Sequence, residues 1–215
     1  MSFNVIKQLL SAEQVALLRK QLADGPWLDG RATAGPEAAR VKNNLQLDLS
    51  SPAHKELSDV VKGALHASEA FKALALPRRM SGILFSRYEP GMEYGRHTDD
   101  AYRALELLRA DIAVTVFLSD LESYEGGALV VGDSAVRLAA GDAVVYPATT
   151  IHGVSTVTRG TRWAAVFWVQ SLVRDESRRE ILYTLQSVIA RVGAPALSLA
   201  LSRVQQNLLR MWVEP

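Results

Sequence analysis

Hydrophobic residues follow two different spacings along this chain. Near both ends they recur every three or four positions, the spacing of one face of an α-helix, whereas between residues 80 and 170 they form short runs separated by turn residues. Short apolar runs between turns are typical of β-strands. The pattern therefore predicts a central β-region with helices before and after it.

The N-terminal part is predicted to be mainly helical. Ser11-Ala-Glu-Gln14 has the form of a capping box and begins an apolar stripe that predicts a helix over residues 12 to 23. Residues 24 to 40 contain several glycines and prolines and are expected to form an irregular loop. A second helix is expected from Ser51-Pro52 to about Phe71, because proline is favoured at the first helical position.

Apolar runs in and just before the central region are expected to be strands. They cover residues 42–49, 81–88, 112–118, 128–131, 135–138, 143–146, 151–157 and 162–169. Gly132-Asp-Ser134 has the composition of a tight hairpin turn, and Gly126-Gly127 and Gly141-Asp142 are expected at turns or bulges. Short strands in this number, with regular turns, predict a double-stranded β-helix, or jelly roll.

Helical spacing returns after residue 171. Asp175 is a candidate N-cap for a helix that ends near Gly193-Ala-Pro195, and a second apolar stripe runs from Leu197 to Met211. We expect these helices to dock on the sheet or on each other. A solvent-facing stripe, or a homodimer through the C-terminal helices, are the alternatives.

The predicted fold class is therefore α+β, a jelly-roll core with N-terminal helices and a C-terminal helical pair. We expect residues 1–77 to form a helical and strand region that packs on the core, residues 78–172 to form the jelly-roll domain, and residues 173–215 to form a helical extension. A chain of this length buries about 70% of the surface that its unfolded form exposes, enough for one sizeable core.

Composition narrows the chemistry. The absence of cysteine excludes disulfides, thiolate zinc sites and iron–sulfur clusters, and leaves histidine and carboxylate as the strong metal ligands. A net charge of +1 gives no electrostatic reason to expect nucleic acid or an anionic membrane as a partner. The N-terminal residues lack the pattern of a signal peptide, and no apolar stretch is long enough to span a membrane, so we expect a cytoplasmic protein.

Two histidines and an aspartate form a candidate metal site. His97 and Asp99 are two positions apart, and on an extended strand such residues face the same way. His152, in a second expected strand, offers a third ligand. Two histidines and one carboxylate, with the remaining positions open, are the ligand set of non-haem Fe(II) oxygenases.

Three further residues have weaker support as ligands. Asp100 would replace Asp99 only if the local backbone were not extended. His54 and His66 lie on the second expected helix, where no carboxylate pairing recommends them as ligands.

Arg162 begins the apolar strand 162–169. A buried arginine needs an anionic partner, and a dicarboxylate suits the forked geometry of the guanidinium group. If the face that carries Arg162 points inward, the arginine shares a cavity with His152. Arg159 is the competing candidate, but it precedes Gly160 in an expected turn, which favours exposure to solvent.

These residues, in their order along the chain, resemble the Fe(II)/2-oxoglutarate-dependent dioxygenases of the prolyl-hydroxylase-like branch. The matching pattern is Tyr88, Tyr94, His97-x-Asp99, His152 and Arg162. The wider context is similar to the bacterial PKHD-type hydroxylases and covers nearly the whole chain. It comprises Val41-Lys-Asn-Asn-Leu-Gln46, Arg87-Tyr88, Glu125-Gly-Gly127, Pro147, His152-Gly-Val154, Thr158-Arg-Gly160 and Trp168-Val-Gln-Ser171.

The resemblance implies a role for each of these residues. His97, Asp99 and His152 would bind Fe(2+). Arg162 would pair with the far carboxylate of 2-oxoglutarate, and the hydroxyl of Tyr88 would contact the same co-substrate. The implied reaction hydroxylates a small-molecule or peptide substrate with O2 and releases succinate and CO2. Ascorbate (vitamin C) is implied as a helper, and a link to iron homeostasis is implied by family association alone.

Two other functions use the same residues. One is a cupin-like metalloenzyme that does not use 2-oxoglutarate or holds another divalent metal, since ligand identity does not fix the metal. The other is a non-catalytic metal- or metabolite-sensing jelly-roll module. The substrate stays unidentified, because residues 24–40 and 99–110, which we expect to select it, carry no decisive signature. Within them, residues 101–110 are expected to form a lid or a short helix.

Overall fold

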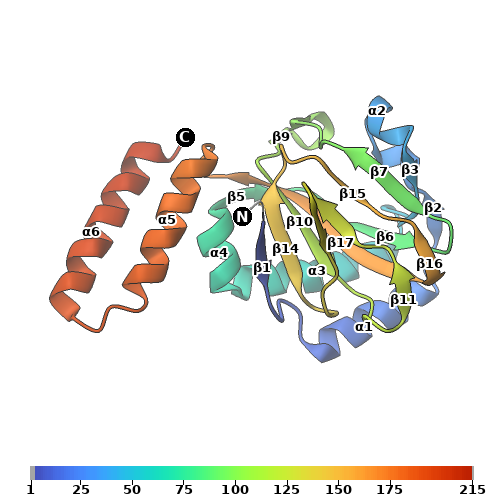
Figure 1. Cartoon of the computed structure of the whole chain (residues 1–215), viewed down its shortest axis with the longest axis horizontal. Helices are drawn as coiled ribbons and strands as arrows, with labels where there is room; N and C mark the ends of the chain where they lie inside the picture. The colour runs from blue at the N-terminus through green and yellow to red at the C-terminus, as the bar shows by residue number, and fades with distance from the viewer. Residues whose placement is uncertain (1–2, 215) are drawn as a thin grey trace.

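The structure, a computed structural model, describes residues 3–214. Its centre is a jelly roll of two facing antiparallel sheets (Figure 1). The larger sheet has the strand order β1 (Asn4–Ile6), β14 (Ala143–Pro147), β10 (Ile112–Phe117), β17 (Arg162–Ser171), β6 (Leu84–Tyr88), β4 (Leu45–Leu47) and β2 (Trp27–Asp29), and β5 (Pro77–Met80) also pairs with β17. The fold is therefore the expected α+β class with a jelly-roll core.

The smaller sheet carries the residues of the candidate site. Its strand order is β13 (Ser134–Val136), β12 (Leu129–Val131), β15 (His152–Val154), β7 (Glu93–His97) and β3 (Lys42–Asn43). Two short ribbons complete the β-structure. They pair β11 (Tyr124–Gly126) with β16 (Val157–Gly160), and β8 (Tyr102–Arg103) with β9 (Leu108–Arg109) through the 3-10 turn η2 (Ala104–Glu106).

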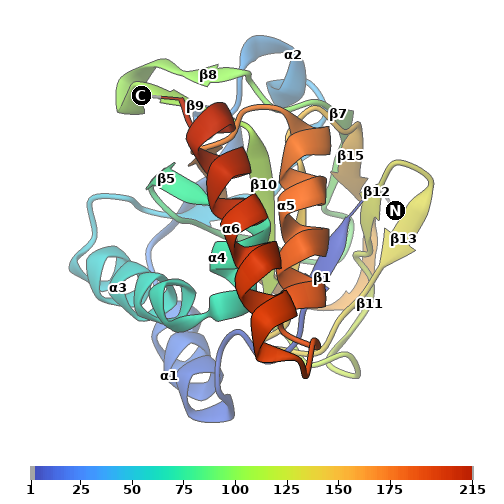
Figure 2. The same ribbon diagram turned by 90° about the vertical axis from the view of Figure 1, so that its left-hand side faces the viewer.

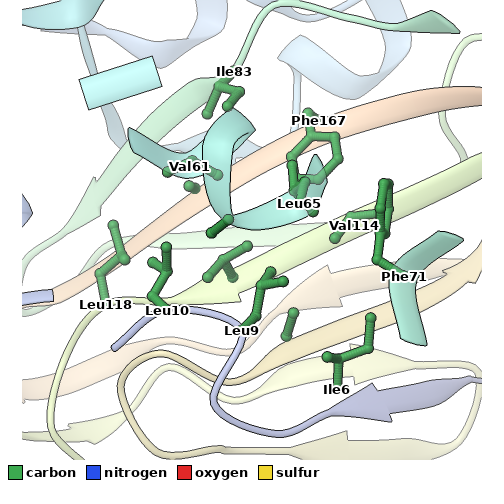
Figure 3. Packing of buried hydrophobic residues seen from close by; sticks show 14 of the residues in the cluster. Ile6, Leu9, Leu10, Val61, Leu65, Phe71, Ile83, Val114, Leu118 and Phe167 are labelled. Carbon is green, nitrogen blue, oxygen red and sulfur yellow. The ribbon is translucent and has the colours of Figure 1, made fainter. Parts of the chain in front are cut away.

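The larger sheet is buried on both faces. One face packs against α1 (Ala12–Ala23), α3 (Pro52–Ala67) and α4 (Glu69–Ala75), where Val61, Leu65 and Phe71 meet Val114 and Phe167 (Figure 3). The other face packs against the smaller sheet in a separate apolar cluster. Double burial explains why every residue of β10 is buried and its apolar residues do not alternate with exposed ones. Packing on both faces also holds the larger sheet in place behind the candidate site.

The C-terminal helices stand to one side of the jelly roll. Helix α5 (Glu176–Ile189) lies against α4 and pairs with α6 (Pro195–Trp212), and in Figure 2 the two run side by side in front of the sheets. The two helices contact each other more than they contact the sheets, and no residue of α6 is buried. Its apolar stripe stays partly open, with Ile181 50% and Val204 49% exposed. None of the helices in residues 3–214 is long and apolar enough to cross a membrane.

Most of the expected elements are confirmed. Helix α1 begins with the capping box formed by Ser11 and Gln14, and Asp175 caps α5. Val131 pairs with Ser134 across the two-residue turn at Gly132, as a tight hairpin requires. The register of β11 shifts between Glu125 and Gly126, which confirms the expected bulge.

Other boundaries were wrong. The helix expected to about Phe71 divides at Ser68 into α3 and α4, because the Ser68 side chain caps a new helix there. The expected strand 42–49 divides into β3 and β4, which belong to different sheets. The expected loop 24–40 holds β2, the 3-10 turn η1 (Gly30–Thr33) and α2 (Pro36–Ala39). Residues 101–110 were expected to form a lid or a short helix; they form the β8–β9 hairpin, so the helix alternative was wrong.

Candidate metal centre

His97 and His152 stand directly opposite each other in the smaller sheet. His97 is the last residue of β7, His152 is the first of β15, and the two are register partners. Their ring centroids are 4.3 Å apart. Cross-strand neighbours on one face of a sheet are close enough to share a ligand. Strand pairing therefore brings together two imidazoles that are far apart in sequence.

The backbone fixes which nitrogen of each histidine faces the pocket. The Nδ1 atom of His97 lies 2.9 Å from the carbonyl oxygen of Gly95, and Nδ1 of His152 lies 2.9 Å from that of Thr150. A carbonyl oxygen only accepts, so Nδ1 carries the proton in both rings and donates it. Nε2 is left with its lone pair free, as a metal-ligating histidine requires.

Asp99 completes the group from a position outside the strand. The expectation that His97 and Asp99 share one extended strand was wrong, since β7 ends at His97. Asp99 lies two residues beyond the strand, and its carboxylate oxygen Oδ1 is 3.6 Å from Nε2 of His152. One ligand atom from each of the three residues lies within 4.8 Å of the others. Two imidazoles and one carboxylate at this spacing fit a divalent first-row metal.

The electrostatics of the three residues also suit a cation. Burial, together with neighbouring His152, lowers the pKa of His97 to about 4, so the ring is neutral and can ligate near neutral pH. Burial raises the pKa of Asp99 above its usual range, although His152 acts in the opposite direction. Its Oδ2 atom is buried and has no hydrogen-bond partner among the described residues. A bound cation would compensate the buried carboxylate.

Two of the alternative ligands are excluded by position. His54 donates from Nε2 to the carbonyl oxygen of Ile83, 2.7 Å away, and packs edge-on against Phe85 on the far side of the larger sheet. His66 is exposed near the end of α3. Asp100 is exposed at the pocket rim beside Gly35 and is not one of the three clustered ligands.

Arg162 lies deep in the same pocket. It is the first residue of β17, directly opposite Tyr88 on β6, and only 1% of its surface is exposed. Its guanidinium carbon lies 5.2 Å from the centroid of the Tyr88 ring and 5.5 Å from that of Phe117. Its Nε and Nη2 atoms have no hydrogen-bond partner among the described residues. A buried guanidinium with unused donors fits a carboxylate ligand.

Arg159 is not placed for this role. Its side chain is exposed and pairs with Glu125 at 2.9 Å on the β11–β16 ribbon. Tyr88 is 3% exposed, and burial raises the pKa of its phenol, so the hydroxyl stays protonated as a neutral hydrogen-bonding group. The structure thus brings Tyr88 and Arg162 together with the metal ligands and leaves Arg159 outside.

Sequence reasoning missed part of the pocket wall. Lys42, Asn44 and Gln46 are all buried and line the pocket, and their spacing of two residues was the signal that could have found them. Arg103 was also missed; it lines the same pocket, with its guanidinium carbon 4.0 Å from the indole centroid of Trp168. The pocket wall therefore carries two cations, Lys42 and Arg103, in addition to the predicted Arg162.

Comparisons with known proteins agree with this geometry. The family described as the 2OG-Fe(II) oxygenase superfamily matches residues 83–170. A PKHD-type hydroxylase of Methylobacterium nodulans is 45% identical, over 97% of this chain and 98% of its own, and one of Delftia acidovorans is 46% identical, over 96% and 97%. The fold matches a viral collagen prolyl hydroxylase from Paramecium bursaria Chlorella virus-1, solved with 2OG, at a TM-score of 0.54, 16% identity and coverage of 80% of this chain and 97% of that one.

Family membership decides among the three functions that the residues left open. The identities cover nearly the full length of both chains, so they include the jelly roll as well as its helices. They favour an oxygenase that uses Fe(2+) and 2-oxoglutarate over a cupin-like enzyme without 2-oxoglutarate or a non-catalytic sensor. The chain belongs to the PKHD-type hydroxylases, Fe(II)- and 2-oxoglutarate-dependent enzymes that hydroxylate a substrate.

Proposed function

We propose that His97, Asp99 and His152 hold the Fe(2+) of this hydroxylase. The observation that carries the proposal is the convergence of three ligand atoms within 4.8 Å, with both Nδ1 atoms committed to backbone carbonyls. Iron bound there with 2-oxoglutarate supplies the oxidative chemistry that consumes O2, releases succinate and CO2, and hydroxylates the substrate. The chain itself fixes the direction of both imidazoles, and burial keeps that of His97 neutral.

We propose that Arg162 binds the far carboxylate of 2-oxoglutarate. The support is its burial beside the metal ligands with Nε and Nη2 unpaired among the described residues. Tyr88, its cross-strand neighbour, would keep a protonated hydroxyl for the same co-substrate. Bidentate binding by a planar guanidinium orients a carboxylate as well as neutralising it.

The remaining expectations are also proposals. We assign residues 78–172 to the dioxygenase domain, residues 1–77 to a region that packs on it, and residues 173–215 to a helical extension. A homodimer through α5 and α6 would cover their open stripe, and light scattering of the purified chain would test it. A cytoplasmic location, the absence of nucleic-acid binding and the use of ascorbate stay predictions from sequence.

The test of the site is anaerobic addition of Fe(2+) and 2-oxoglutarate to the protein. A weak visible charge-transfer band from the iron–2-oxoglutarate chelate is expected in the wild-type protein. His97→Ala should lose the band, and Arg162→Ala should form it only at higher 2-oxoglutarate concentration. An unchanged band in His97→Ala would show that the iron is bound elsewhere.

A further inference from the structure

Lys42 is a buried ammonium on the wall of the pocket that holds His97 and His152. It lies on β3, directly opposite Tyr94 of β7, and only 7% of its surface is exposed. Its Nζ atom is 5.1 Å from the centroid of the Tyr94 ring, and that ring stacks on His97 with centroids 3.7 Å apart. One aromatic ring therefore separates the ammonium from a proposed iron ligand.

The ammonium has more hydrogen-bonding capacity than the chain uses. Nζ donates to Thr33 Oγ1 at 3.1 Å, and the Thr33 hydroxyl in turn donates to Gln46. An ammonium has three N–H donors, so two are left. Burial accordingly lowers the pKa of Lys42 to about 8, helped by the charge of Arg103.

No carboxylate of residues 3–214 forms an ion pair with Lys42. The carboxylates whose charges act on it are Asp29 and Asp99, and these are engaged with Arg31 and His152. Burying a cation without a counter-ion is costly, so a lysine with a purely structural role is expected to form an ion pair. This arrangement is typical of a site completed by an anionic ligand.

Loading the pocket with cofactors does not supply the missing anion. The charges of Fe(2+), the Asp99 carboxylate, the 2-oxoglutarate dianion and Arg162 cancel. Arg103, the other cation of the wall, is ion-paired with Glu106. Asp100 is exposed at the rim, where water screens its charge. Lys42 is then the one pocket cation among the described residues without a counter-ion.

We propose that Lys42 binds a carboxylate on the substrate that this enzyme hydroxylates. The proposal rests on the function proposed above, because it assumes that 2-oxoglutarate takes Arg162. The side-chain amide of Asn44 is buried on the same wall and can orient the polar groups beside that carboxylate. The substrate class is therefore organic acids, and a substrate without a negative charge is excluded.

The test uses the Fe(2+)-loaded full chain with saturating 13C-labelled 2-oxoglutarate and measures labelled succinate. A bacterial extract is separated by ultrafiltration into small molecules and peptides, and each pool is divided on an anion-exchange resin. The retained fraction of one pool should raise succinate formation above the basal rate, and the unretained fractions should not. Which pool is active distinguishes a small acid from an acidic peptide.

The variants separate this proposal from the one on which it rests. Lys42→Met should keep the chelate band but need about 10- to 100-fold more of the active fraction, since a hydrogen bond to a charged group is lost. Lys42→Arg should restore part of the response. Lys55→Met, at an exposed lysine paired with Asp59, should behave as wild type.

Two results would overturn the proposal while leaving the enzyme's cofactors intact. One is a retained fraction that stimulates succinate formation no more than the unretained one. The other is a Lys42→Met protein that needs more 2-oxoglutarate to form the chelate band, which would make the lysine a co-substrate ligand. Failure of the wild-type protein to form the band would instead contradict the proposed function.

Discussion

Nε2 of His152 and the carboxylate of Asp99 lie 3.6 Å apart although Asp99 is outside the strand that carries His97. The carboxylate lies close to an imidazole, and its Oδ2 atom has no hydrogen-bond partner among the described residues, so the site is short of one positive charge. Each ligand should therefore matter far more for metal affinity than for folding.

Asp99→Ala is expected to weaken Fe(2+) binding by more than about 100-fold, because even the hydrogen-bond partners of metal ligands are worth about 10- to 100-fold. Labelled succinate formation should fall with it. Metal titration and the succinate assay measure the two effects. Asp100→Ala, the neighbouring carboxylate at the exposed rim, is the matched control and should keep both.

Gly153→Ala is expected to loosen the metal centre through the backbone. A Cβ at Gly153 would lie 2.7 Å from the carbonyl oxygen of Tyr94, so β15 and β7 would have to separate at the point where His152 faces His97. Overpacking of this kind costs about 1–3 kcal/mol of unfolding free energy. Urea unfolding of the metal-free protein and Fe(2+) titration should both change.

Gly193→Ala is the control for that substitution. No atom lies within 4 Å of the position that its Cβ would take, so stability and metal affinity should stay close to wild type. Equal metal affinity in the two alanine variants would mean that the spacing of β7 and β15 does not set the ligand geometry.

The sequence predicted the elements whose signals are local. The capping box at Ser11, the turn at Gly132 and the apolar run of β10 each depend on neighbouring residues, and each is confirmed. The convergence of the candidate ligands was also predictable, since residue types and order suffice to name His97 and His152 as candidates.

The rest of the site depends on pairing across long stretches of chain. That His97 faces His152 follows from the register of β7 on β15, which no local pattern encodes. Lys42 sits at the start of a segment that divides between two sheets, so its burial beside Tyr94 could not be predicted from a single continuous strand. Asp99 likewise lies beyond the end of β7, outside the paired strand.

Arg162→Met is expected to separate co-substrate binding from stability. The 2-oxoglutarate requirement should rise about 10- to 100-fold through loss of charge-assisted hydrogen bonds. Without ligand, the unfolding free energy should stay unchanged or rise by about 1–4 kcal/mol, because an uncompensated buried charge is replaced by an apolar side chain. Arg159→Met, at the exposed pair with Glu125, should change neither. Loss of stability in ligand-free Arg162→Met would show that the guanidinium has a structural partner.

The lowered pKa of Lys42 predicts a pH dependence of stability on the alkaline side. The folded-state pKa is about 8, against an ordinary value of 10.5, so between these values the unfolded chain binds more protons than the folded one. Stability therefore rises with pH across this window, relative to a protein without the group. Urea unfolding of the metal-free wild type and of Lys42→Met at a series of pH values measures the difference.

The unfolding free energy of wild type minus that of Lys42→Met should become more favourable to wild type as the pH rises from about 8 to 10.5, because the buried ammonium loses its charge. Added carboxylate ligand should move the change to higher pH, since an anion stabilises the protonated form. Other lysines and tyrosines titrate in both proteins and cancel in the difference. A difference that is flat across the window would mean that the ammonium is solvated, and the argument for an anion at Lys42 would lose its electrostatic basis.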